Sequence, residues 1–179
     1  MFKFFFFCLL GFSLVTIALK WLIIGRYRPS QHPLWSSFVW RSELVNGLCE
    51  AFVYPFFVSL WLGTPWATSF FRLMGSECGN DIYLDTSEIT EFDLVHIGDR
   101  ASLSTLATVQ THLFEDRVMK MSHLKIGEGA SVGAYSVVLY DSEIEAGGRV
   151  LSLSLLMKGE VVPAGTTWQG IPCGFVSSV

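Results

Sequence analysis

Apolar residues recur at every sixth position along the C-terminal third of the chain. Counted from Ile126, these positions hold Ile126, Val132, Val138, Ile144, Val150, Leu156, Val162 and Trp168. The residue four places after each is small in most repeats. A period of six fits neither one face of an α-helix, with 3.6 residues per turn, nor one face of a strand, which repeats every two residues. It fits a coil with three short sides whose apolar residues point inward, and it predicts a parallel β-helix.

The same spacing is present earlier in the chain, at Tyr83, Ile89 and Val95 and again at Ile97, Leu103 and Val109. The step from Val109 to Ile126 falls one residue short of three sides. We therefore expect residues 113–125 to leave the coil and rejoin it, and function tends to lie in such loops on rigid scaffolds. The expected fold class is mainly β: a left-handed parallel β-helix of hexapeptide repeats over residues 76–179, preceded by N-terminal transmembrane or amphipathic helices over residues 1–75.

Charge and hydropathy divide the chain at the same place. Residues 1–75 hold six basic and two acidic residues, whereas residues 76–179 hold six basic and fourteen acidic residues. Hydrophobic residues make up 51% of the chain, which is high for a soluble protein. The basic, apolar N-terminal segment is typical of a membrane-associated region, and the acidic C-terminal segment is typical of a water-exposed domain. No basic patch with interleaved aromatic residues is present, so we expect no nucleic-acid partner.

Residues 4–24 form an apolar run with one charge, Lys20. A helix of this length reaches about 31 Å, which matches a hydrocarbon core of ~30 Å, and we interpret it as a transmembrane helix. A signal peptide cleaved near Ala18 is the alternative, although the apolar run continues past that point. Residues 44–62 form a second apolar segment, which either spans the membrane as a hairpin with the first or lies in the interface. Residues 65–74 are typical of a short amphipathic helix ended by Gly75.

The sequence leaves the membrane topology open. The positive-inside rule places Arg26, Arg28 and Arg41 in the cytoplasm. The β-helix then lies outside the cell if the second segment spans the membrane, and in the cytoplasm if that segment lies flat.

His112 stands at the start of the expected excursion and is the candidate catalytic base, because an imidazole can take a proton near neutral pH. Glu115 and Asp116 follow closely, and either is expected to hold the ring. A histidine that only caps the loop is the alternative. Arg117 and Lys120 are the candidate substrate-binding residues, since they suit a phosphate of a pantetheine arm, but they also suit pairing with the two acids.

Other polar residues favour no second site. The run 84–93 is expected to form solvated corners and a turn. The four cysteines form no CxxC motif, so they indicate neither zinc nor a redox pair. A three-histidine zinc site from His96, His112 and His123 is conceivable on this fold, but we expect no metal.

Several strings point to a known family. They are KWLIIGRYRP (20–29), HPLW (32–35), LDT (84–86), TEFDLV (90–95), QTHLFEDRVMK (110–120), SVVLYD (136–141) and LLMKGE (155–160). Together they resemble the C-terminal region of the ε-poly-L-lysine synthetase family of membrane-bound nonribosomal peptide synthetases. The resemblance extends from about residue 20 to 173, and residues 110–120 carry its longest string.

This resemblance implies an acyltransferase-like module that joins aminoacyl units to an amine. The donor would be a phosphopantetheine thioester on a carrier protein or CoA, and no cofactor is expected to be bound covalently. His112 matches the family's candidate base. The family carries adenylation and carrier domains and three tandem acyltransferase-like domains, whereas in these 179 residues we expect one β-helix and neither an adenylation nor a carrier domain. The implied partners are therefore the membrane, an adenylation–carrier protein in trans or in a longer chain, and two further β-helices in a homo-trimer or pseudo-trimer. The family also implies a cell-membrane protein with its β-helix on the cytoplasmic side.

Two other readings remain at this point. One is a membrane-anchored assembly scaffold without catalysis, and the other is a metal-dependent hydratase on the same fold.

Overall fold

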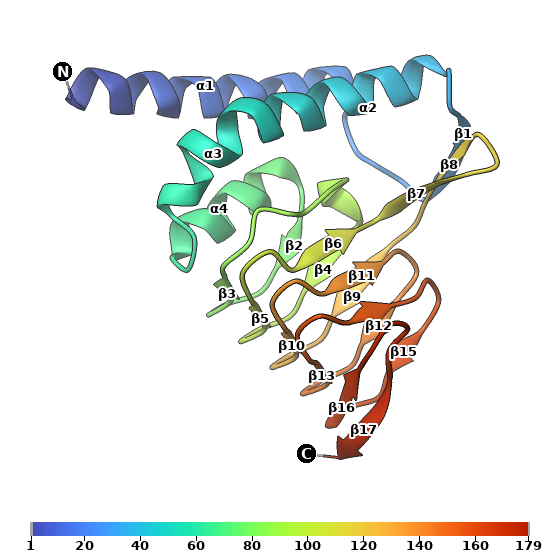
Figure 1. The fold of residues 1–179 in the computed structure, drawn as a ribbon. Helices are drawn as coiled ribbons and strands as arrows, with labels where there is room; N and C mark the ends of the chain where they lie inside the picture. Colours follow the sequence, from blue (N-terminus) through green and yellow to red (C-terminus); the bar gives the residue numbers. More distant parts are fainter. Residues whose placement is uncertain (1, 179) are drawn as a thin grey trace.

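The computed structural model describes the backbone of residues 2–178 and the side chains of residue 7 and residues 9–178. Helices come first and a coil of short strands follows (Figure 1). The helical elements are α1 (Phe2–Ile23), α2 (Ser37–Leu48), the π-helical turn η1 (Cys49–Val53), α3 (Tyr54–Phe56), η2 (Val58–Leu60), α4 (Pro65–Met74) and η3 (Phe92–Leu94).

Most strands are only two to four residues long. They are β1 (Ser30–Pro33), β2 (Glu77–Cys78), β3 (Tyr83–Leu84), β4 (Val95–Ile97), β5 (Ser102–Leu103), β6 (Thr108–Gln110), β7 (His112–Glu115), β8 (Val118–Met121), β9 (Leu124–Ile126), β10 (Ser131–Val132), β11 (Val137–Leu139), β12 (Glu143–Ile144), β13 (Arg149–Val150), β14 (Leu155–Leu156), β15 (Val161–Val162), β16 (Thr166–Gln169) and β17 (Gly174–Ser178). Three parallel sheets run along the coil, in the orders β3-β5-β10-β13-β16, β6-β11-β14 and β2-β4-β9-β12-β15. The last strand, β17, pairs antiparallel with β16.

The six-residue spacing is confirmed as the source of the core. Ile126 pairs with Ile144, and Ile144 pairs with Val162, so equivalent residues of the regular coils are eighteen positions apart. From Ile126 to Val162 the sixth residues are all buried. The prediction fails at the first coil, where Tyr83 is 51% exposed and its neighbour Leu84 points inward instead. The reason is that the early coils are nineteen residues long, since Tyr83 pairs with Ser102.

Small residues sit where the coil turns sharply. Ala130, Ser136 and Ser142 are buried at these corners. The Ser136 hydroxyl donates to the Leu151 carbonyl at 2.8 Å, and the Ser142 hydroxyl donates to the Met157 carbonyl at 2.8 Å. Each buried serine hydroxyl thus has a hydrogen-bond partner, the carbonyl of a residue fifteen positions later.

The coil is interrupted once, by a hairpin. His96 pairs with Lys125, a separation of 29 positions, which is one regular coil plus eleven residues. The additional residues form β7 and β8, which pair antiparallel, and β1 joins β8 on the other side. The expected bounds of 113–125 are corrected: His112 already belongs to β7, and Leu124 is already back in the coil because it pairs with Val95.

The helices lie across one end of the coil, with α4 between them and the first strands (Figure 1). An ion pair joins the two parts: buried Lys20 of α1 contacts Asp93 at 2.6 Å. Asp93 also accepts the Tyr27 backbone N–H at 3.1 Å. The predicted amphipathic helix is confirmed as α4, and Gly75 ends it in the left-handed conformation with φ of 118°.

The second apolar segment begins earlier than expected. Ser36 caps the helix by accepting the Val39 N–H, and the helical run continues from Ser37 to Leu60. It passes Pro55 through the π-helical turn η1, which relieves the proline's clash with the preceding turn. Among the described residues this run alone is long and apolar enough to cross a membrane by length and composition, which is weak evidence for a span. The expected membrane helix at 4–24 is helical as α1, and its place in a membrane stays a prediction.

The coil core yields a stability prediction. Replacing Ile144, fully buried in β12, with Ala is expected to lower the free energy of unfolding by about 2–5 kcal/mol, because it leaves a cavity between stacked coils. The matched control is Val161→Ala in the adjacent strand β15, whose side chain is exposed; it should change stability by less than about 0.5 kcal/mol. Urea unfolding followed by circular dichroism measures both, and equal losses would contradict the inward assignment.

Candidate active site

His112 stands where the chain leaves the coil. It is the first residue of β7, next to Thr111, and its side chain is only 12% exposed. Its ring lies edge-on to Phe114, with the two centroids 5.3 Å apart. The imidazole is therefore held in one place rather than free in solvent.

A buried carboxylate, Glu91, holds the ring. Glu91 Oε2 lies 2.7 Å from His112 Nδ1 and accepts the Thr111 hydroxyl at 2.7 Å. The other oxygen, Oε1, accepts the Asn46 amide of α2 at 3.4 Å. Glu91 is fully buried and adopts φ of 36°, a left-handed conformation that is uncommon for a residue with a side chain. Strain of this kind gathers at functional sites, so the pair is the candidate catalytic centre.

The stacking of the first coils brings these residues together. Ile89 bridges Val109, and the Thr111 backbone N–H donates to the Thr90 hydroxyl at 3.3 Å, so residues about twenty apart are neighbours in adjacent coils. Glu91 consequently lies against His112, although 21 positions separate them in the sequence.

The pair shifts both pKa values. Burial by itself lowers the pKa of His112, but the hydrogen bond and negative charge of Glu91 outweigh it, and the net shift is upward. Burial by itself raises the pKa of Glu91, but the hydrogen bond and charge of His112 outweigh it, and the net shift is downward. The raised pKa of His112 stabilises the fold fully below pH ~6.5, and that contribution is lost as the pH rises through the folded-state value.

The acids expected to hold the ring lie elsewhere. Glu115 ends β7 opposite Val118, at the far end of the hairpin from His112. It pairs with Lys120 at 3.0 Å and also with Lys158. The expectation that Glu115 or Asp116 holds His112 is therefore corrected, because the antiparallel hairpin places both at its far end, away from the His112 ring.

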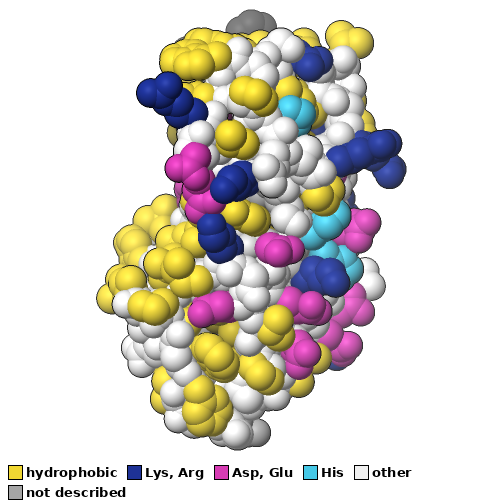
Figure 2. All heavy atoms as spheres, turned by 90° about the vertical axis from the view of Figure 1, so that its right-hand side faces the viewer, with side chains coloured by type: hydrophobic (Ala, Val, Ile, Leu, Met, Phe, Trp, Pro, Cys, Tyr) yellow, Lys and Arg dark blue, Asp and Glu magenta, His cyan; other side chains and the backbone are white. Residues whose placement is uncertain are grey.

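The candidate binding residues are placed at the hairpin as well. Asp116 and Arg117 form its turn, both with positive φ. Lys120 is engaged by Glu115, which corresponds to the second of the two readings that the sequence left open. Figure 2 looks onto this side of the molecule and shows Lys and Arg side chains close to Asp and Glu side chains.

Sequence reasoning missed Glu91. The run 84–93 was expected to be solvated, but Glu91 and Asp93 are buried on either side of buried Phe92. One signal was present in the sequence: Glu91 and Asp93 alternate with the apolar residues Phe92 and Leu94. These residues belong to the coil that stacks on Thr111 and His112.

The histidines do not gather around a metal. His96 pairs with exposed Glu77 at 3.1 Å, while His112 pairs with Glu91. In the described part of the chain, no group of three or more His, Cys, Asp or Glu side chains could hold a metal ion.

Three acetyltransferase structures are similar in fold to this chain. A maltose O-acetyltransferase from Clostridium difficile 630 superposes with a TM-score of 0.57 at 13% identity, covering 84% of this chain and 93% of that one. A galactoside acetyltransferase in complex with coenzyme A gives 0.52 at 12% identity, covering 95% and 82%. A hexapeptide-repeat acetyltransferase from Vibrio cholerae gives 0.52 at 14% identity, covering 68% and 84%. The chain thus has the hexapeptide-repeat acetyltransferase fold.

The sequence is similar to a peptide synthetase. It is 43% identical over 162 residues to the Delta-poly-L-ornithine synthetase of Acinetobacter baumannii (strain AB307-0294). The match covers 90% of this chain but only 12% of that relative's length. No protein-family model matches the chain.

The ring contact yields a prediction. Glu91→Gln is expected to lower the pKa of His112, because a neutral amide no longer stabilises the imidazolium. Titration of the His112 ring by NMR measures the shift. Glu115→Gln serves as the control and should leave the His112 pKa unchanged, since Glu115 pairs with Lys120 and Lys158 instead. An equal effect of both substitutions would show that Glu91 is not the partner in solution.

Proposed function

We propose that this chain is an acyltransferase-like module that transfers an aminoacyl or acyl group from a pantetheine thioester to an amine. The fold it shares with acetyltransferases and its 43% identity to a synthetase support this proposal. The observation that carries it is the 2.7 Å contact between His112 and buried Glu91. The donor would be CoA or a phosphopantetheine carrier protein, charged by an adenylation partner in trans or in a longer chain.

The pair suits general base catalysis. Glu91 occupies Nδ1 of His112, which leaves Nε2 as the nitrogen that takes a proton. As the neutral amine attacks the thioester carbon, the new C–N bond forms and Nε2 removes the amine proton. The C–S bond then breaks, and His112 passes the proton to the leaving sulfur. Backbone N–H groups near the hairpin would hold the oxyanion, and Arg117 with Lys120 would face the phosphate of the donor.

We propose further that the module sits at a membrane, with a left-handed coil on the cytoplasmic side, where charged donors are found. Large aromatic side chains of the helical part, including Trp35 and Trp40, are exposed and suit a membrane interface. Asn46, which would be costly in hydrocarbon, faces Glu91 instead. The depth of the Ser37–Leu60 run stays open.

A row of exposed apolar corners supports a homo-trimer or pseudo-trimer. Leu106, Tyr135, Leu153 and Ile171 occupy equivalent corners of successive coils and are 45–74% exposed. The first three have positive φ, where glycine is the unstrained choice. The neighbouring corner column does use glycine, at Gly129, Gly147 and Gly165. Bulky side chains kept in strained, exposed positions are typical of an interaction surface, and two further β-helices are the proposed occupants.

A non-catalytic assembly scaffold is the second candidate. It is favoured by the enclosure of His112, since a ring that is 12% exposed and paired with a buried carboxylate can also serve as a structural link.

Catalysis separates the two candidates. In a transfer assay with an aminoacyl pantetheine thioester and an amine, followed by mass spectrometry, His112→Ala is expected to lower the rate by about 10²–10⁴-fold. Glu91→Gln should slow the reaction and move the rise of rate with pH to lower pH, because the neutral form of His112 is the active one. His96→Ala, at an exposed histidine, is the control. If His112→Ala formed as much product as the parent, catalysis by His112 would be rejected and the non-catalytic scaffold would be the remaining candidate.

Assembly is tested at the corner column. Leu153→Asn is expected to weaken self-association, because it removes an exposed apolar side chain, while folding stability stays equal or rises, since Asn tolerates positive φ better than Leu. Analytical ultracentrifugation in detergent measures the mass. Val161→Ala, an exposed apolar change on another side, should leave the mass unchanged. The same mass for all three proteins would count against the corner column as the interface.

A further inference from the structure

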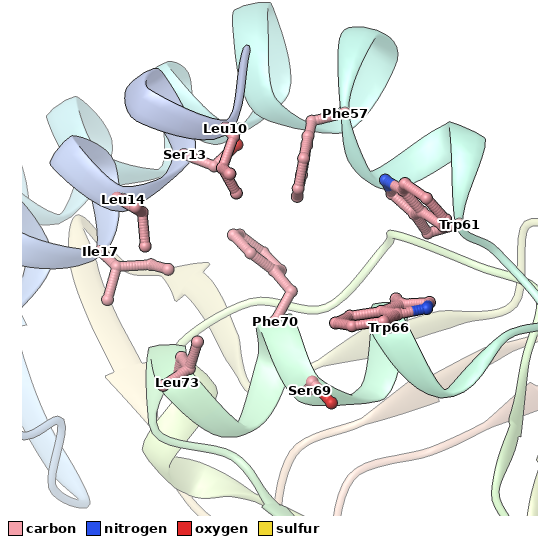
Figure 3. Close-up of a pocket in the computed structure, with 10 residues that line it drawn as sticks. All are labelled: Leu10, Ser13, Leu14, Ile17, Phe57, Trp61, Trp66, Ser69, Phe70 and Leu73. Atoms are coloured by element: carbon pink, nitrogen blue, oxygen red, sulfur yellow. The ribbon is translucent and has the colours of Figure 1, made fainter. Parts of the chain in front are cut away.

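Two separate cavities lie beside α1 and α4, and together they are called the α1–α4 groove below. The first cavity is apolar. It has a volume of about 370 Å³ and is lined mainly by Leu14 and Ile17 of α1, Phe57, and Trp66, Phe70 and Leu73 of α4 (Figure 3). The two serines at the cavity are already satisfied: the Ser13 hydroxyl donates to the Leu9 carbonyl and the Ser69 hydroxyl donates to the Pro65 carbonyl, each at 2.9 Å. Neither serine hydroxyl therefore needs a hydrogen bond from an occupant, and most of the other lining side chains are apolar.

The loop that follows α1 and the last turn of α4 carry arginines. A second cavity of about 440 Å³ has both cationic and acidic lining residues, among them Arg26, Arg28, Arg72, Asp93, Glu77, Trp21 and His123. Of the two acids, exposed Glu77 lies 3.1 Å from His96. The Trp21 indole N–H donates to the Leu73 carbonyl at 2.8 Å, which ties α1 to α4 where the two cavities approach. Ile17 and Trp21 are four residues apart, or about 6 Å along the helix.

The charges at this end are unequally matched. Asp93 is neutralised by buried Lys20. Arg72 donates to the carbonyls of Cys78 and Gly79, which leaves its charge without a carboxylate. Arg26 and Arg28 are exposed, and no contact with a carboxylate is found for them in the described part of the chain. The cavity therefore favours an anion, and guanidinium groups suit phosphate in particular.

We propose that the α1–α4 groove binds one anionic membrane phospholipid, with an acyl chain in the apolar cavity and the phosphate at Arg26 and Arg28. The apolar cavity suits an alkyl chain, and the neighbouring cationic cavity suits a phosphate. A phospholipid carries both groups side by side. Leu14, Trp66 and Leu73 are exposed at the rim, as expected for a site that opens to lipid. The site rests on the proposed membrane association but not on acyl transfer.

The test measures lipid binding directly. The detergent-solubilised chain is mixed with phosphatidylglycerol or with phosphatidylcholine of the same acyl chains, and bound lipid is counted by native mass spectrometry. Glycerol phosphate is a third arm, because it offers the anion without the chain. We expect one phosphatidylglycerol to bind at least about tenfold more tightly than phosphatidylcholine, and glycerol phosphate not to compete.

Two variants address the two ends of the groove. Arg26→Gln with Arg28→Gln should remove the preference for phosphatidylglycerol, and Ser69→Trp should fill the cavity and weaken binding of both lipids. Arg149→Gln, exposed on β13 of the coil, is the matched charge control and should bind as the parent does. Circular dichroism confirms that each variant is folded.

Other outcomes overturn the site. Competition by glycerol phosphate, with no effect of Ser69→Trp, would mean a simple anion site. Equal binding of both lipids, unchanged by the arginine substitutions, would mean general detergent-like association. Flotation on phosphatidylcholine vesicles tests membrane association separately, so a failure of that broader proposal is distinguishable from a failure of this site.

Discussion

The fixed length of the stacked coils governs the rest of the structure. Each short strand pairs with the equivalent strand of the next coil, and the inward residues stack in rows, as in Ile126, Ile144 and Val162. A single extra residue is tolerated, since Leu84 and Leu103 remain paired and buried across nineteen positions, but eleven extra residues cannot be accommodated in the same way. The eleven additional residues are therefore expelled as the β7–β8 hairpin, and His112 stands at its base because the coil ends at Thr111.

Two buried carboxylates attach the helices to this coil. Glu91 immediately precedes η3 and Asp93 lies within it. Glu91 binds His112 and Asn46, while Asp93 binds Lys20 and the Tyr27 backbone. A buried charge is costly unless it is paired and hydrogen-bonded, and each of these has several partners. Glu91 orients the candidate base, and Asp93, two positions later, binds the helices to the coil. The same short segment therefore supports both the candidate site and the packing of the helices.

The sequence was informative where structure is local or strictly periodic. The buried sixth residues and the end of α4 at Gly75 follow from spacing and from glycine chemistry, and both were predicted. Tyr83 was misplaced because the early coils are a residue longer, which a fixed period cannot reveal. Glu115 was chosen for its closeness to His112 in the chain, whereas Glu91 reaches the ring only through contact between coils.

The strand β1 links the segment after α1 to the β7–β8 hairpin. It follows α1 closely and pairs with β8 from Ser30 opposite Met121 to Pro33 opposite Val118. This tether consists largely of main-chain hydrogen bonds, which do not depend on side-chain identity. Backbone pairing with β8 therefore connects the segment after the first helix to the hairpin that begins at His112.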